Sequence, residues 1–170
     1  MTNHDENVTS QISRSFLNFV LYPDQERQQS LYSLLQSIIE HVQFDRMCFE
    51  LLYLRTFMVD YTTTLLFGES QLRNNILDSF YEQLKSAAND SPVHTVLLEG
   101  VKSRLALYAE AVNEPLHNEL GWNVGTVFAG MLEQEQNSFV VMVGDNLYKQ
   151  YYQQISQLVL QHHAPNSEYH

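Results

Sequence analysis

The sequence predicts an all-α fold, a single domain built as a bundle of about six or seven helices around a buried central helix at about residues 45–67. Apolar residues recur three and four positions apart in successive segments, and the four prolines and six glycines separate these segments. Hydrophobic residues make up 44% of the 170 residues, which excludes disorder for most of the chain. We expect the domain over residues 8–163, with loose tails at 1–7 and 164–170.

The first two helices are predicted from their apolar faces and their end residues. The first runs from about Ser10 to Leu21, and Pro23 lies beyond its end. The second begins after Asp24, whose side chain can cap it, and extends to about Val42. The apolar faces consist of Ile12, Phe16, Phe19 and Val20 in the first helix, and of Leu31, Leu34, Leu35, Ile38 and Val42 in the second.

The third helix is expected from Asp45, which offers a new N-terminal cap, to Phe67, before the helix-stopping Gly68. It is apolar on more than one side. Because helices that are hydrophobic all round are buried, we place this helix at the centre of the fold.

Four further helices complete the prediction. Ser70 caps a fourth helix that ends near Asn89, and Ser91 and Pro92 mark the start of a fifth that reaches about Val112. A short helix follows at 124–134, and a long one ends the domain. Residues 138–144, SFVVMVG, suit a buried strand as well as a helix. Since one isolated strand would have no partner, we assign them to the last helix.

The charge pattern limits the classes of partner. The chain has 20 acidic and 9 basic residues and a formal charge of -11, which repels phosphate backbones and anionic lipids when the basic groups are scattered, as they are here. We therefore expect no nucleic-acid and no membrane partner, and favour a protein partner or a basic or amphipathic peptide. The single Cys48 allows no internal disulfide, and no secretory signal is visible, so we expect a cytoplasmic protein.

EPLHNELGWNVG, residues 114–125, contains the pattern most suggestive of chemistry. Glu114 and His117 have the Glu-x-x-His spacing of helical metal sites, which makes them weak candidate ligands. Pro115 ends the preceding helix, so the carboxylate of Glu110 belongs to a different axis. A metal site needs at least three ligands, and we expect a helix cap and a turn instead.

EPLHNEL also resembles a motif of the cytoplasmic chaperones that assist the maturation of molybdenum-containing redox enzymes. Those chaperones are acidic, all-helical single domains with a Glu-Pro-x-Asp-His motif followed by a Glu-Leu pair. Glu114, Pro115, Glu119 and Leu120 stand in roughly corresponding places, whereas the aspartate is missing and His117 is displaced by one position. The resemblance covers seven residues and implies a chaperone-like role.

Two arginines lie on apolar helix faces. Arg55 falls within the apolar stripe of the central helix, and Arg104 falls, with His94, on that of the fifth. Buried guanidinium groups need anionic partners. One possibility is that each arginine pairs with an internal carboxylate, such as Glu50 or Asp60, or extends to solvent. The other is that Arg55, Arg104 and His94 bind the carboxylate or phosphate of a ligand.

Aromatic residues point to a contact surface. The segment NLYKQYYQQISQ carries three tyrosines that cannot share one side of a helix, so they either complete the core or form a face for a partner or a homodimer. Glycines on both sides of the single tryptophan predict a hinge-like change of chain direction with an aromatic plug. The candidate surface residues are Tyr148, Tyr151, Tyr152 and Trp122.

The leading functional hypothesis is a non-enzymatic cytoplasmic protein-interaction module, such as a chaperone, adaptor or assembly factor, with an acidic, tyrosine-bearing helical surface. The alternative is a sensor or carrier that binds an anionic, partly apolar small molecule near Arg55 and Arg104. A metal-dependent enzyme around Glu114 and His117 ranks third. The sequence has no phosphate-binding loop, dinucleotide-binding glycine motif or nucleophile elbow, so we assign no catalytic residue and expect no cofactor.

Overall fold

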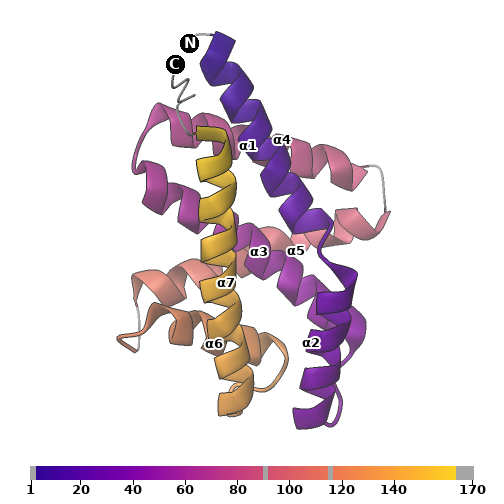
Figure 1. The fold of residues 1–170 in the computed structure, drawn as a ribbon. Coiled ribbons are helices and arrows are strands. Elements are labelled where there is room, and N and C mark those ends of the chain that lie inside the picture. The colour runs from indigo at the N-terminus through magenta and orange to yellow at the C-terminus, as the bar shows by residue number, and fades with distance from the viewer. Residues whose placement is uncertain (1–2, 90–91, 115–116, 164–170) are drawn as a thin grey trace, which may run out of the picture.

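Figure 1 shows a computed structural model that describes residues 3–89, 92–114 and 117–163. This part of the chain forms seven helices and no strand, which confirms the predicted all-α bundle. The helices are α1 (Asn3–Leu21), α2 (Gln25–Ile38), α3 (Phe44–Phe67), α4 (Gln71–Asn89), α5 (Pro92–Asn113), α6 (Leu120–Met131) and α7 (Ser138–His163). None of these described helices combines the length and the apolar character needed to cross a membrane.

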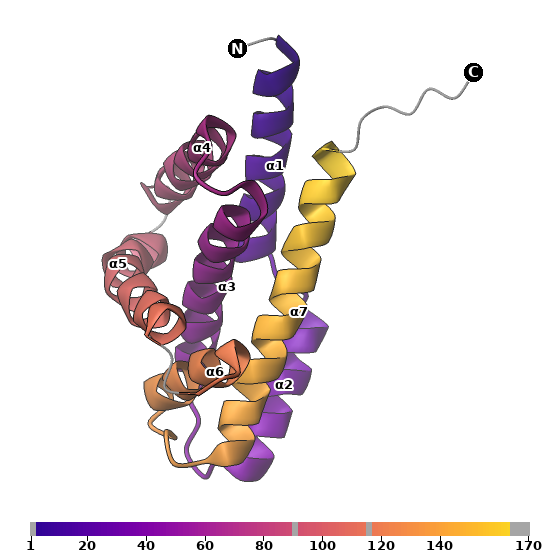
Figure 2. The ribbon, with the colours of Figure 1, turned by 90° about the vertical axis from the view of Figure 1, so that its left-hand side faces the viewer.

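Helix α3 occupies the centre of the bundle, as its all-round apolar sequence predicts. It contacts all six of the other helices, and every residue from Glu50 to Val59 is buried. Figure 2 shows α3 enclosed between α1, α5 and α7. Since the apolar surface of α3 faces every direction, the remaining helices are arranged as a single layer around it.

Three of the predicted helix ends are confirmed, two by side-chain hydrogen bonds and one by its backbone conformation. The Asp24 side chain accepts from two backbone N–H groups in the first turn of α2, at 3.0 and 3.2 Å. The Ser70 hydroxyl accepts from a backbone N–H in the first turn of α4 at 3.2 Å. Gly68 ends α3 with a φ of 57°, which a residue without a side chain adopts at little cost.

Other boundaries differ from the prediction. Helix α1 begins at Asn3 and so includes most of the expected N-terminal tail, while the expected tail at 164–170 lies outside the described residues. Helix α2 ends at Ile38, before the predicted Val42. Asp45 lies inside the first turn of α3 and is not its cap, because the helix starts one residue earlier. The predicted cap at Ser91 lies outside the described residues.

Helices α6 and α7 pack through glycines. A Cβ atom on Gly144 would lie 2.6 Å from the Cα of Gly125, and one on Gly121 would lie 3.0 Å from the Tyr148 ring. Both Gly121 and Gly125 lie within α6, so the predicted hinge around Trp122 is wrong. These glycines instead permit close contact between α6 and α7. Residues 138–144 form the start of α7, as predicted, and their two central valines are buried.

We predict that Gly125→Ala lowers the free energy of unfolding by about 1–3 kcal/mol, because the new methyl group would overlap the Val141 carbonyl oxygen. Gly130→Ala is the matched control in the same helix, since its Cβ would lie 4.0 Å from the nearest neighbouring side-chain atom, the Cβ of Glu135. There the better helix propensity of alanine should leave stability unchanged or raise it by about 0.4–1 kcal/mol. Urea denaturation measures both, and equal effects would contradict the close contact.

Candidate functional site

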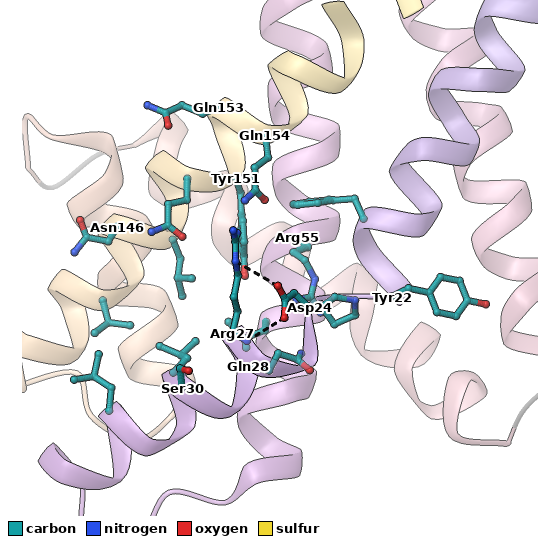
Figure 3. Close-up of a pocket in the computed structure, with 18 of the residues that line it drawn as sticks. Tyr22, Asp24, Arg27, Gln28, Ser30, Arg55, Asn146, Tyr151, Gln153 and Gln154 are labelled. Atoms are coloured by element: carbon teal, nitrogen blue, oxygen red, sulfur yellow. Dashed lines mark hydrogen bonds and ion pairs between the residues drawn. The ribbon is translucent and has the colours of Figure 1, made fainter. Parts of the chain in front are cut away.

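A groove lies between α2 and α7, with α3 behind it, and has a volume of about 750 Å³ (Figure 3). This is within the range of about 300–1,000 Å³ that is common for ligand sites. We call it the α2–α7 groove. Its lining consists of Phe19, Tyr22, Pro23 and Asp24 around the end of α1, Arg27, Gln28, Ser30, Leu31 and Leu34 in α2, Leu51 and Arg55 in α3, and Val143, Asn146, Leu147, Gln150, Tyr151, Gln153, Gln154 and Gln157 in α7.

The α7 wall of the groove is mainly apolar toward the N-terminal end of the helix and polar toward its C-terminal end. Leu31 and Leu34 of α2 face the groove from one side, and Val143 and Leu147 of α7 from the other. Four glutamines follow along α7 at helical spacing, from Gln150 to Gln157. An occupant of this groove therefore meets both hydrophobic surface and amide groups that donate and accept hydrogen bonds.

Arg55 is the buried charge of this groove. Only 4% of the residue is exposed, and its Nε atom is buried without a hydrogen-bond partner among the described residues. None of the ion pairs found in the described part of the chain includes Arg55. Its guanidinium lies close to Tyr151 of α7. Burial raises the pKa of the Tyr151 phenol, and the charge of Arg55 and a hydrogen bond between the two side chains oppose that rise.

The other charged residues of the lining are at its edge. Asp24 and Arg27 form an ion pair at 3.5 Å, with side chains that are 54% and 74% exposed. Taking a charge out of water costs several kcal/mol unless an anion and hydrogen bonds compensate it. Since Asp24 is engaged with Arg27 and with the first turn of α2, a carboxylate or phosphate from outside the protein would supply the anionic partner that Arg55 lacks among the described residues.

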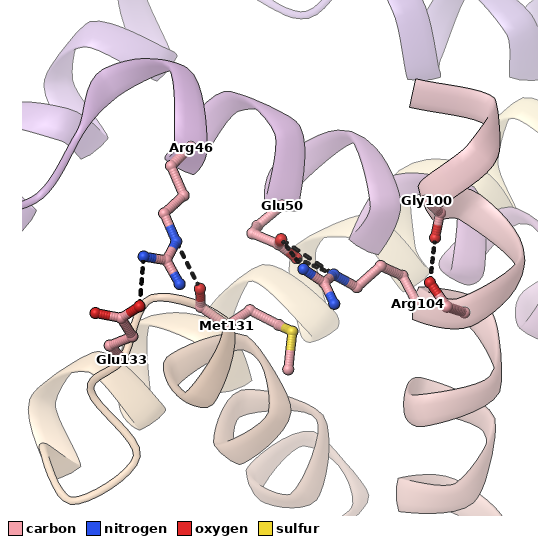
Figure 4. A network of polar contacts seen from close by, with 7 residues as sticks. Arg46, Glu50, Gly100, Arg104, Met131 and Glu133 are labelled. Carbon is pink, nitrogen blue, oxygen red and sulfur yellow. Dashed lines mark hydrogen bonds and ion pairs between the residues drawn. The ribbon is translucent and has the colours of Figure 1, made fainter. Parts of the chain in front are cut away.

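Arg104 has a different environment. Its Nε and terminal nitrogen donate to both oxygens of the Glu50 carboxylate at 3.0–3.2 Å, and its guanidinium lies 5.8 Å from the ring centre of Tyr53 (Figure 4). Burial raises the pKa of Glu50, and the paired Arg104 opposes this. Arg104 does not line the α2–α7 groove, so the structure does not bring it together with Arg55.

Figure 4 also shows a third arginine that the sequence did not single out. Arg46, in the first turn of α3, donates from Nε to the backbone oxygen of Met131 at 2.9 Å. Its terminal nitrogen forms an ion pair with Glu133 at 2.9 Å. Arg46 thus satisfies a carbonyl at the C-terminal end of α6 and connects the beginning of α3 to the loop that precedes α7.

The segment around Glu114 and His117 is a joint between α5 and α6. Both side chains are exposed, and no cluster of three or more possible metal ligands occurs among the described residues. The joint is held by Asn123, whose amide accepts from the His117 N–H at 3.0 Å and donates to the His117 oxygen at 2.8 Å. Asn123 was not among the predicted site residues, although a polar residue in an apolar helix indicates a possible structural role. The His94 side chain lies outside the described residues.

The three tyrosines of α7 lie in three different environments. Tyr151 is buried, Tyr148 is half-buried, and Tyr152 is 37% exposed. Trp122 is half-buried beside the His117 ring, with ring centres 6.5 Å apart. The strongest apolar exposure on α7 lies elsewhere, at Phe139 and Leu160, which are both 66% exposed.

Comparison of the chain with protein-family models, with curated proteins and with solved structures finds no match.

We predict that Arg55→Met leaves the free energy of unfolding unchanged or raises it by up to about 3 kcal/mol, because it replaces a buried charge with an apolar chain of similar length. Arg104→Met should lower it, since it leaves the buried Glu50 carboxylate unpaired. Breaking a fully buried pair costs about 3–5 kcal/mol, and we expect less here because 31% of the Arg104 side chain is exposed.

Chemical denaturation of the two variants measures this contrast. An Arg55→Met variant as destabilised as Arg104→Met would show that Arg55 has an internal partner.

Proposed function

We propose that the protein is a non-enzymatic binding module, of the kind used by chaperones, adaptors and assembly factors, and that the α2–α7 groove holds an anionic, partly apolar ligand. The observation that carries this proposal is the buried Nε of Arg55, which lines the groove and has no partner among the described residues. A guanidinium binds carboxylate and phosphate groups through paired hydrogen bonds.

The local charge of the groove supports an anionic ligand in spite of the acidic chain. The charged residues of the lining are Asp24, Arg27 and Arg55, so their formal charges of -1, +1 and +1 sum to +1, against -11 for the whole sequence. Repulsion by the distant acidic groups is screened over about 8–10 Å at physiological salt, whereas a contact in the groove is screened much less. Binding is therefore decided by the groove and not by the net charge.

The composition of the lining supports binding over catalysis. It includes neither histidine nor cysteine nor lysine, and its single carboxylate, Asp24, is a helix cap. A catalytic site usually places a nucleophile or a general base within reach of a second polar group that orients it. The apolar residues and glutamines of this lining instead suit recognition of a ligand with a hydrophobic body.

The test uses decanoate as a probe, because it combines one carboxylate with an apolar chain. We expect isothermal titration calorimetry to detect binding to the unmodified chain, with affinity reduced about 10–100-fold in Arg55→Met, the effect of losing a charge-assisted hydrogen bond of about 1.5–3 kcal/mol. Arg14→Met, which changes an exposed arginine on α1 outside the groove lining, is the matched control and should bind decanoate unchanged.

Decyltrimethylammonium, with the same chain and the opposite charge, should bind weakly and independently of Arg55. Equal binding of both probes, or decanoate affinity that survives Arg55→Met, would contradict the proposal.

A further inference from the structure

The apolar surface of α7 continues past the end of the groove. Phe139 is 66% exposed and Met142 is 48% exposed. Each lies four positions before a residue of the lining, Val143 and Asn146, and residues four apart share a helix face. Leu34, on the opposite wall in α2, is 51% exposed. The groove is thus the deeper section of a longer strip, which is mainly apolar from Phe139 to Leu147 and carries glutamines from Gln150 to Gln157.

The dimensions of this strip match a helix. From Phe139 to Gln157 it includes 19 residues of α7, whose 18 steps of 1.5 Å each give a length of about 27 Å. A small molecule confined to the cavity would leave Phe139 and Met142 exposed, whereas a helix lying along α7 would cover them. Figures 1 and 2 show α2 and α7 side by side, running in opposite directions, so an added helix would lie between two parallel walls.

Resting on the proposed function, we infer that the occupant of the α2–α7 groove is an amphipathic helix of a partner protein, and that an aspartate or glutamate near its middle pairs with Arg55. Arg55 lies beside Tyr151, close to the midpoint of the strip. The apolar residues of the partner helix would cover Leu34, Phe139 and Met142. Its polar edge would meet the glutamines of α7.

Charge complementarity selects this occupant. A basic helix would place its cations against Arg55, and an entirely apolar one would leave the buried Nε of Arg55 without a partner. In a helix with an acidic residue flanked by apolar ones, the acidic residue pairs with the buried cation and the apolar residues pack against the walls of the groove. Other registers are disfavoured, because an acidic residue placed elsewhere along α7 would lose the pairing with Arg55 and face apolar side chains or glutamines.

The experiment uses a synthetic 18-residue helical peptide of leucine, alanine and glutamine with one central glutamate, labelled for fluorescence anisotropy. Two matched peptides carry glutamine or lysine at the central position. We expect the glutamate peptide to bind the full chain about tenfold more tightly than the glutamine peptide, and the lysine peptide to bind most weakly. Arg55→Met should abolish the difference between glutamate and glutamine.

A second pair of variants tests the part of the strip outside the cavity. Phe139→Ser should weaken binding of the glutamate peptide at least about fivefold, through loss of buried apolar area, and leave decanoate affinity unchanged. Leu160→Ser is the matched control, because Leu160 is equally exposed on the same helix but lies beyond the groove. It should change neither affinity.

The outcomes separate the two proposals. If decanoate binds through Arg55 but the glutamate peptide does not bind, or binds without regard to Phe139, the groove takes a small molecule and the helix inference is overturned. If neither probe depends on Arg55, the proposed function fails as well. Sedimentation that shows a dimer dissociated by Phe139→Ser and not by the peptide would assign the strip to a second copy of the chain and also overturn the inference.

Discussion

The rest of the structure depends on the burial of α3, whose apolar surface faces every direction. A helix of this kind is stable in water only when other helices cover all its sides, and each polar group it carries inward then needs a partner. Two buried residues of α3 are charged. Glu50 is matched by Arg104 of α5, whereas the Nε of Arg55 has no partner among the described residues. The candidate site is the place where this requirement is unmet for a buried charge of α3.

The position of α7 explains why that place is open to a ligand. Glycines on α6 and α7 let the two backbones approach closely, so α7 is held against α6 on one side. On another side α7 contacts α3 and covers Arg55 with Tyr151. Helix α2, by contrast, is oriented by the Asp24 cap and the short link from α1, and only part of it contacts α7. The groove occupies the space between them.

The sequence carried enough information for the helices and for the identity of the unusual residues. Caps and stops are local, so Asp24, Ser70 and Gly68 could be assigned from a few neighbouring positions. The helical wheel likewise identified Arg55 and Arg104 as charges on apolar faces. It also placed residues 138–144 in the last helix, because an isolated strand would have lacked hydrogen-bond partners.

The sequence could not tell which arginine is paired, because the answer depends on contacts between distant segments. Arg104 meets a carboxylate 54 positions away, and nothing local distinguishes it from Arg55. The same limit applies to Gly125, which looks like a hinge until Gly144 is placed opposite it. Asn123 acts through backbone groups of the joint before α6, and this role requires the fold of the joint to be known.

The NMR signals of the arginine Nε–H groups, assigned with single arginine variants, test most directly whether Arg55 binds the ligand. We expect the Arg55 Nε–H signal to move downfield on addition of decanoate, because a new hydrogen bond to a carboxylate forms. The Arg104 Nε–H signal should stay in place, because this group already donates to Glu50. An Arg55 signal that does not respond, or a response confined to Arg104, would contradict the claim that Arg55 is the ligand-binding charge.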